Sequence, residues 1–349
     1  MSRLLGIEVP AKRSEEILTS LGFHVTSADE AASVEVPSWR DDVERAQDLI
    51  EEIARVHGYE KVPAVLPSNA LETPLQDVGR MVEGRARVAL AAAGFDEVVN
   101  YSFVAPRELS VLEPDKKPIA LKNPLTAEQS VMRTTMLAGL LGNLRHSLNR
   151  QVDDIRLYEL GRVYLQSEGE GANQPAREPR ILAGVMYGHR TRLQWSTGRE
   201  PIDFYDLKGV VEQIVEAAGI RDVKFLHGEQ HALHPRSATR VEAGGRAVGS
   251  LGELHPAVAK ALDLPRGVFA FQLDFQGLAD AASVVPGFRG VPRFPAVLRD
   301  LAVVLAAELA AGEVAATIRD AGEGLVEDVK LFDVYRGENI PAGRKSMAF

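Results

Sequence analysis

The chain of 349 residues contains no cysteine. This excludes disulfide bonds, thiolate metal sites and a cysteine nucleophile, and it is typical of a protein from a reducing compartment. Long apolar segments are also missing, because the longest candidate, at residues 301–311, is interrupted by Glu308. The N-terminal residues lack the apolar core of a signal peptide. We therefore predict a cytoplasmic protein that does not enter a membrane.

Excess positive charge is absent as well. The formal net charge is −9 at pH 7, so strong electrostatic binding of nucleic acid by this chain alone is not expected, and only local contacts remain. No Walker loop, G-x-S-x-G motif or strand-linked G-x-G-x-x-G motif is present, which removes the usual phosphate cradles and serine nucleophiles. The length leaves room for two or three domains.

The most informative segment is PSWRDDVERAQDLIEEIARVHGY, residues 37–59. A helix over residues 43–57 would place apolar side chains on one side and Asp48, Glu51 and Glu52 on the other. Asp41 or Asp42 would lie where a carboxylate can cap the first free N–H groups of that helix. The sequence therefore predicts an amphipathic helix with an acidic side.

Two interpretations of this acidic side stay open. It can be an ordinary solvated face, on which Glu51 pairs with Arg55 four residues later. It can also hold a hard divalent cation, because Asp48 and Glu52 are like charges one turn apart and Mg²⁺ takes oxygen ligands. The residue spacing alone does not decide between them.

Two further clusters carry weaker signals. His227, His231 and His234 have spacings that suit a metal on a helix, but the glycine and proline around them favour a loop with exposed imidazoles. A basic group suits either an acidic partner or RNA, or a solvated helix face. Its members are Arg133, Arg145, His146, Arg150 and Arg156.

Hydrophobic periodicity and turn residues predict an α+β chain in three parts, at residues 1–65, 66–280 and 291–349. The first part combines a helix, two strands and the acidic helix. In the second, a larger core, IRLYELG and RVYLQ would form two antiparallel strands joined at a glycine. The third reads strand, helix, strand, and RKSMAF begins a further strand. Such a piece has an exposed sheet edge, so we expect the natural chain to continue past Phe349.

Across nearly its full length, the sequence resembles the β subunit of bacterial phenylalanyl-tRNA synthetase. Residues 37–59 are similar to the fifth module of that subunit. The segment from FPAVLRDLAVVL through YRGENIPAGRKS is similar to the opening of its ferredoxin-like anticodon-binding domain. Five segments resemble successive landmarks of its synthetase-like core: NPLTAEQSVMRTTMLAGLL, IRLYELGRVY, DFYDLKGVVE, HPRSA and LGELHP.

The resemblance implies a fold for each part. These are a small mixed, winged-helix-like module, a class II synthetase-like core with an antiparallel sheet, and a truncated ferredoxin-like βαβ domain. The resemblance also implies that Asp42, Asp48, Glu51 and Glu52 bind Mg²⁺, whereas Asp41 occupies a variable position. The resemblance further implies that the core is a non-catalytic copy, and the sequence agrees, since no Gly-rich arginine motif for ATP phosphates follows FAFQLDF. We therefore expect no catalytic residue in this chain.

The resemblance implies partners too. A catalytic α subunit would use ATP to attach phenylalanine to tRNA(Phe), within an α₂β₂ assembly that this chain supports. The oligonucleotide-binding and editing modules of the family are not recognisable, so we expect a central fragment whose role in editing is in doubt. The alternative is a standalone interaction module derived by truncation. A carboxylate-metal hydrolase ranks lower, because a two-metal site needs ligands from several elements.

Overall fold

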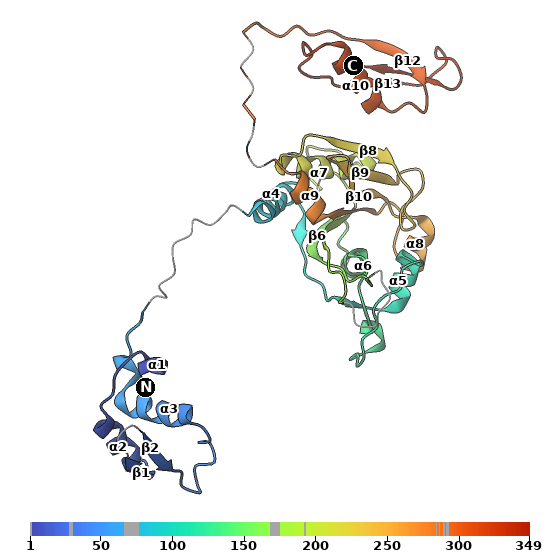
Figure 1. Ribbon diagram of the computed structural model, residues 1–349. Helices are drawn as coiled ribbons and strands as arrows, with labels where there is room; N and C mark the ends of the chain where they lie inside the picture. The colour runs from blue at the N-terminus through green and yellow to red at the C-terminus, as the bar shows by residue number, and fades with distance from the viewer. Residues whose placement is uncertain are drawn as a thin grey trace. The chain divides into compact units, whose positions relative to one another are not determined.

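The computed structural model of the protein describes residues 2–27, 31–65, 77–167, 175–191, 193–283, 285, 287–288, 290 and 293–349. The chain divides into two compact units, Met1–Gln76 and Asp77–Phe349. Figure 1 shows the elements of each unit. Within the described residues, no helix has the length and apolar character needed to cross a membrane.

The first unit packs two helices with a short antiparallel hairpin (Figure 1). Its elements are α1 (Ser2–Leu5), α2 (Ala11–Ser20), β1 (His24–Ser27), β2 (Ala32–Glu35), α3 (Ala46–His57) and the 3-10 turn η1 (Tyr59–Lys61). Ile17 and Leu18 of α2 are buried with Phe23 and with Ile53 of α3. This small core leaves the acidic side of α3 free to meet other groups.

The second unit contains a seven-stranded sheet in the order β3-β6-β7-β11-β10-β9-β8 (Figure 1). Its strands are β3 (Asp96–Glu97), β6 (Ile155–Arg162), β7 (Arg180–Tyr187), β8 (Val223–His227), β9 (Thr239–Ala243), β10 (Arg246–Glu253) and β11 (Phe269–Asp274). The pair β3–β6 is parallel and the other neighbours are antiparallel. The sheet is thus mixed: the predicted antiparallel pairing is found between all neighbours except β3 and β6, where the edge strand is parallel.

Helices cover both faces of this sheet. They are α4 (Val78–Ala92), α5 (Pro106–Leu112), α6 (Leu137–Leu148), α7 (Phe204–Ala217), α8 (Pro256–Ala261) and α9 (Phe275–Ala281). A two-stranded ribbon of β4 (Phe103–Val104) and β5 (Val131–Met132) and the turn η2 (Ala127–Gln129) complete this part.

Alternate residues of β7 show how the two faces are filled. Leu182 and Met186 join a core with α4, α7 and α9, whereas Ala183 and Val185 join a core with α5, α6 and α8. Successive side chains of a strand point to opposite faces, so an uninterrupted apolar run marks a strand buried on both sides. Each face of the sheet is therefore occupied by packed side chains.

The last residues form a separate three-stranded antiparallel sheet in the order β12-β14-β13. Its elements are β12 (Ala302–Ala306), α10 (Ala311–Ala321), β13 (Asp333–Tyr335) and β14 (Arg344–Ala348). The strand predicted from RKSMAF is confirmed as β14, which pairs with both of its neighbours. Met347 and Phe349 are buried, but α10 has no buried residue, so this sheet has a small core.

Candidate functional site

Arg40 holds together two of the carboxylates that the sequence assigns to a cation. Its guanidinium donates to both oxygens of Asp42, at 2.8 and 2.7 Å, and lies 3.1 Å from Glu52 Oε1 on α3. Its carbon centre also lies 5.2 Å from the centroid of the Phe23 ring. These contacts lower the pKa of Asp42 and raise that of Arg40. A cation of the protein itself thus occupies the space between the two carboxylates.

The other predicted ligands have different surroundings. Glu52 also accepts a hydrogen bond from Arg55 at 2.5 Å, and hydrogen bonds from Arg55 and Arg40 lower its pKa. Asp48 accepts the backbone N–H groups of Glu44 and Arg45 at 2.9 and 2.7 Å, which lowers its pKa. The carboxylate contact at the start of α3 is therefore made by Asp48, not by Asp41 or Asp42, and it is made to the N–H groups of the N-cap Arg45 and of the residue before it.

Glu51 points to solvent, and within the part of the chain that the structure describes it makes no ion pair. The predicted pair of Glu51 with Arg55 is wrong, because Arg55 turns to Glu52. Around α3, as elsewhere among the described residues, no three Asp, Glu or His side chains come close enough to hold a metal ion. Three of the four carboxylates already have partners in this arrangement: Asp42 and Glu52 bond to Arg40, Glu52 also to Arg55, and Asp48 to two backbone N–H groups.

The histidine cluster is dispersed. His227 ends β8, and the ring of His234 accepts the backbone N–H of Arg236 at 3.1 Å, as in a tight turn. The rings of His234 and His255 stack with centroids 6.1 Å apart. The loop interpretation of this cluster fits better than a metal site.

The basic group is not one surface. Arg133 is 3% exposed and donates to Glu159 at 2.8 Å and to the carbonyl of Arg162 at 2.8 Å. Glu159 is equally buried and also accepts the Asn100 side-chain amide at 2.7 Å. Because this pair is internal, Arg133 is not available to an acidic partner or to RNA.

The sheet face beneath α6 is closely packed around Gln272. Gln272 of β11 accepts hydrogen bonds from the Thr135 hydroxyl at 2.8 Å and from the Met136 backbone N–H at 3.0 Å. The gap lined by Leu137, Gln272 and neighbouring side chains has no room for a water molecule. The side chains around Gln272 are therefore tightly packed.

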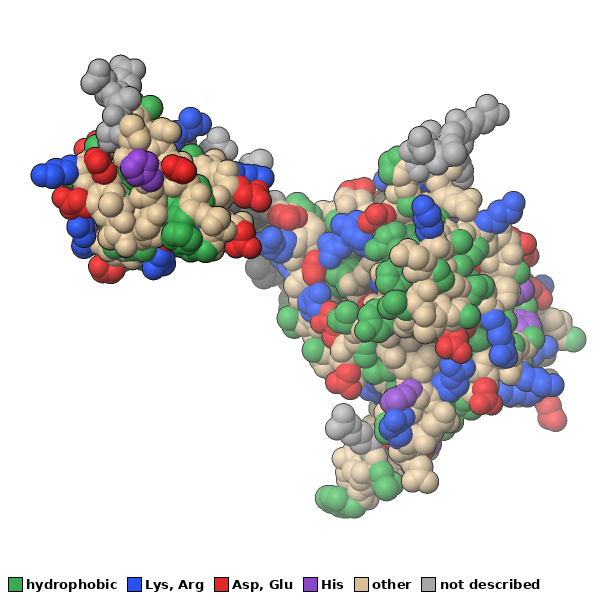
Figure 2. All heavy atoms as spheres, turned by 90° about the horizontal axis from the view of Figure 1, so that it is seen from below, with side chains coloured by type: hydrophobic (Ala, Val, Ile, Leu, Met, Phe, Trp, Pro, Cys, Tyr) green, Lys and Arg blue, Asp and Glu red, His purple; other side chains and the backbone are tan. Residues whose placement is uncertain are grey.

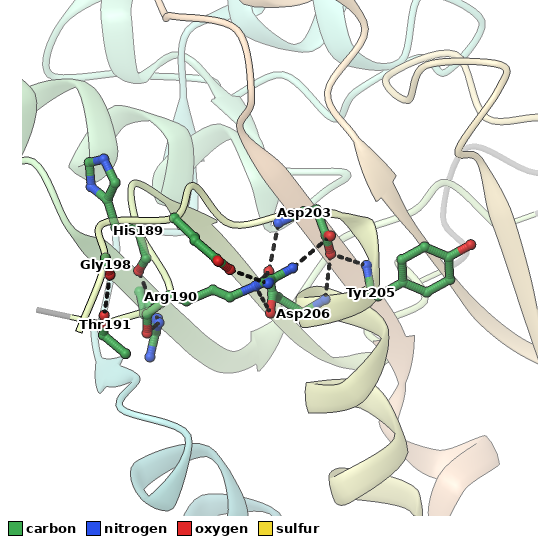
Figure 3. Close-up of polar contacts among 9 residues, drawn as sticks. His189, Arg190, Thr191, Gly198, Asp203, Tyr205 and Asp206 are labelled. Carbon is green, nitrogen blue, oxygen red and sulfur yellow. Dashed lines mark hydrogen bonds and ion pairs between the residues drawn. The ribbon is translucent and has the colours of Figure 1, made fainter. Parts of the chain in front are cut away.

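Arg190 is a polar centre that the sequence analysis did not identify (Figure 3). It donates to Glu200 at 2.7 Å, to Asp203 at 2.8 Å and to Asp206 at 2.9 Å. Asp203 and Asp206 also form the capping box of α7, since each carboxylate accepts the backbone N–H of the other residue, at 3.1 and 2.7 Å. The spacing D-x-x-D before an apolar run is the signal that could have revealed this structural role.

Three family models match successive parts of the chain. They are described as "tRNA synthetase B5 domain" at residues 1–59, "Phenylalanyl tRNA synthetase beta chain CLM domain" at residues 62–275 and "Ferredoxin-fold anticodon binding domain" at residues 292–349. The second of these alone spans more than half of the chain.

Curated relatives are similar over almost the whole chain. The phenylalanine–tRNA ligase β subunit of Anaeromyxobacter dehalogenans is 45% identical over 99% of this chain, and that of Moorella thermoacetica is 41% identical over 99%. This chain spans 44% and 43% of the length of those two proteins. A pyrrolysyl-tRNA synthetase structure from Desulfitobacterium hafniense is 18% identical, with 57% of this chain and 67% of that chain covered. Its TM-score of 0.45 is too low to assign a fold.

Proposed function

Because the chain belongs to the phenylalanyl-tRNA synthetase β-chain family, we propose that it acts as part of the β subunit of phenylalanine–tRNA ligase. That enzyme would attach phenylalanine to tRNA(Phe) at the expense of ATP, and its α subunit would carry out the chemistry. The observation that carries this proposal is the family match over residues 62–275.

We divide the chain by function at the bounds that the sequence suggested. Residues 1–65 would form a winged-helix-like module, for which helices α2 and α3 and the hairpin β1–β2 give support. Residues 66–280 would form the class II synthetase-like core, and residues 291–349 a surface for the anticodon stem of tRNA. The whole assembly would be an α₂β₂ tetramer in the cytoplasm.

Charging assays test the proposal. The chain, the catalytic α subunit and the mixture of both would be incubated with ATP, labelled phenylalanine and tRNA(Phe). We expect no aminoacyl-tRNA from this chain alone. Product from this chain without the α subunit would overturn the non-catalytic assignment.

Co-purification separates the proposal from its alternative, a standalone interaction module. We expect the α subunit to elute with a tagged form of the chain. A chain that is folded by circular dichroism but never retains the α subunit would favour the alternative.

We propose a Mg²⁺ site at Asp42, Asp48, Glu51 and Glu52, and its formation requires that Arg40 move. Hard cations take carboxylate oxygens, and Mg²⁺ demands near-octahedral geometry. Arg40 would have to leave Asp42 and Glu52 before these oxygens could meet an ion. Calorimetric titration with MgCl₂ tests this, since binding should disappear in Asp48→Asn if the site is real.

A further inference from the structure

A groove lies between the first turn of α7, the strand β8 and the turn at residues 234–239. Its volume is about 430 Å³. No Asp or Glu lines it, although the chain as a whole has a net charge of −9. Its lining residues are Phe204, Tyr205, Lys208, Phe225, Leu226, His227, Arg236, Ser237, Ala238 and Thr239. Aromatic rings and nitrogen donors therefore meet in one depression.

Several of these groups have no partner. Within the described residues, no carboxylate pairs with the Arg236 guanidinium, and the His227 ring makes no hydrogen bond. Arg190, by contrast, is surrounded by three carboxylates. Arg236 and His227 are thus free to meet an anionic ligand, whereas Lys208 pairs with Glu212.

Aromatic surface is available beside these donors. The Tyr205 side chain is 74% exposed, and its ring packs edge-on against Phe204 with centroids 5.5 Å apart. Figure 3 shows the Tyr205 ring projecting away from the Arg190 cluster. Lys208 lies 4.5 Å from the centroid of the Phe225 ring and also contacts Glu212. A ligand would meet the exposed Tyr205 ring together with the Arg236 guanidinium, which pairs with no carboxylate among the described residues.

We propose that this groove binds single-stranded RNA, with a base stacked on Tyr205 and a phosphate held by Arg236 and His227. Stacking on aromatic side chains together with a cationic groove is how proteins hold single strands without reading their sequence. The inference rests on the proposed function, because it adds a contact for the tRNA of the ligase. It assigns that contact to a surface outside the anticodon-binding domain.

Fluorescence anisotropy with the full chain tests this, using a labelled oligouridylate of about 12 nucleotides, a length within the range that such grooves cover. We expect Tyr205→Ala to raise the Kd about tenfold, since stacking of one base has an effect of that order. Tyr205→Phe keeps the ring and should bind as the wild type does. Tyr101→Ala is the matched control, because Tyr101 is 73% exposed and lies outside the groove.

Arg236→Gln tests the phosphate contact. It should weaken binding and reduce the slope of log K against log salt by about 0.7, the effect of one lost phosphate contact on a single strand. Arg266→Gln removes the same charge from an exposed site elsewhere, so it should leave the slope unchanged. A purely structural role of Arg236 would not change the salt dependence.

The outcomes separate this inference from the proposed function. Wild-type binding that persists unchanged in Tyr205→Ala and Arg236→Gln overturns the groove and leaves the ligase assignment intact. Absence of any oligonucleotide binding by the wild type also overturns the groove, and it leaves the ligase assignment intact, because charging and co-purification test that assignment separately. If AMP binds and the oligonucleotide does not, the groove is a site for a free nucleotide and the RNA proposal is overturned. Loss of α-subunit co-purification in these variants, with RNA affinity unchanged, would make the groove a protein interface.

Discussion

At the scale of single residues, Arg40 determines what the acidic helix can do. A guanidinium between two carboxylates neutralises them without a bound ion, and its planar fork suits the two oxygens of Asp42. The family resemblance implies that a Mg²⁺ ion binds to the same carboxylates, Asp42 and Glu52. The structure therefore makes Arg40 a competitor for any ion that would bind there.

Arg40→Met tests this competition. Methionine keeps apolar contact with Phe23 but frees Asp42 and leaves Glu52 with Arg55 alone, so MgCl₂ should raise the melting temperature of the variant more than that of the wild type. Thermal melts with MgCl₂ and with EDTA measure the difference. Arg13→Met, which removes an exposed pair with Glu16, is the control. Equal shifts in all three proteins would show that Arg40 does not compete.

The lowered pKa values of Asp42, Asp48 and Glu52 predict acid sensitivity of the first unit. A carboxyl whose pKa is lower when folded stabilises the fold above its unfolded pKa, and this contribution is lost as pH falls through the folded pKa. Those unfolded values are 3.8 for Asp and 4.5 for Glu. Melting temperatures should therefore start to fall as pH drops below about 4.5 and continue to fall below 3.8. Asp48→Asn should show a smaller acid-induced fall.

The buried pair of Arg133 and Glu159 gives a prediction for stability. Glu159→Leu leaves a buried guanidinium without its carboxylate, which should lower the free energy of unfolding by about 3–5 kcal/mol. The double variant Arg133→Met/Glu159→Leu removes both charges and should be less destabilised than the single one. Urea denaturation followed by circular dichroism measures both. A double variant that is less stable than Glu159→Leu would contradict this account.

At the scale of elements, the start of α7 depends on Asp203. Its carboxylate accepts the N–H groups of Tyr205 and Asp206 at 2.8 and 3.1 Å. Asp203→Ala should cost about 1 kcal/mol, the usual effect of a lost N-cap. Glu200→Ala is the control, since Glu200 also pairs with Arg190 but caps no helix. Equal losses in thermal melts would assign the effect to the Arg190 pair instead.

Local patterns predicted most elements but not their tertiary adjustments. The break expected at Gly161 is wrong, because β6 runs through it to Arg162. A Cβ at Gly161 would lie 2.5 Å from the Arg133 guanidinium and 2.8 Å from Met136, so the glycine makes room for a neighbour and ends no strand. Only the packed sheet reveals that reason.

The candidate site shows the same limit. The sequence placed Asp48 and Glu52 correctly on one helix, as α3 confirms. It could not show that Asp48 accepts backbone N–H groups at the start of the helix, or that Arg55 pairs with Glu52 and not with Glu51. Hydrogen-bond partners depend on three-dimensional distances, and several partners were equally close in the sequence. The pairing of Gln272 with Thr135, which are 137 positions apart, left no local pattern at all.

At the scale of the whole molecule, the chain combines separate cores with separate sheets. Proteins with several cores often unfold in more than one step, so one melting temperature need not describe this chain. Figure 2 shows side chains of both signs on the face that it draws, so a net charge of −9 is compatible with a groove at Tyr205 that no Asp or Glu lines. A binding function in such a chain is therefore argued from the residues of each surface and not from the net charge of the chain.

The coverage of both faces of the seven-stranded sheet has a consequence for the exchange of backbone protons with solvent. β7 and β11 lie inside the sheet, paired on both sides, and packed side chains cover them above and below. Their amide protons should reach deuterated water only when the core around them opens completely, whereas those of α10, which has no buried residue, should exchange through local fraying. Mass spectrometry after deuterium labelling would measure the exchange rates of β7 and β11, and these rates would give the free energy of unfolding of this core.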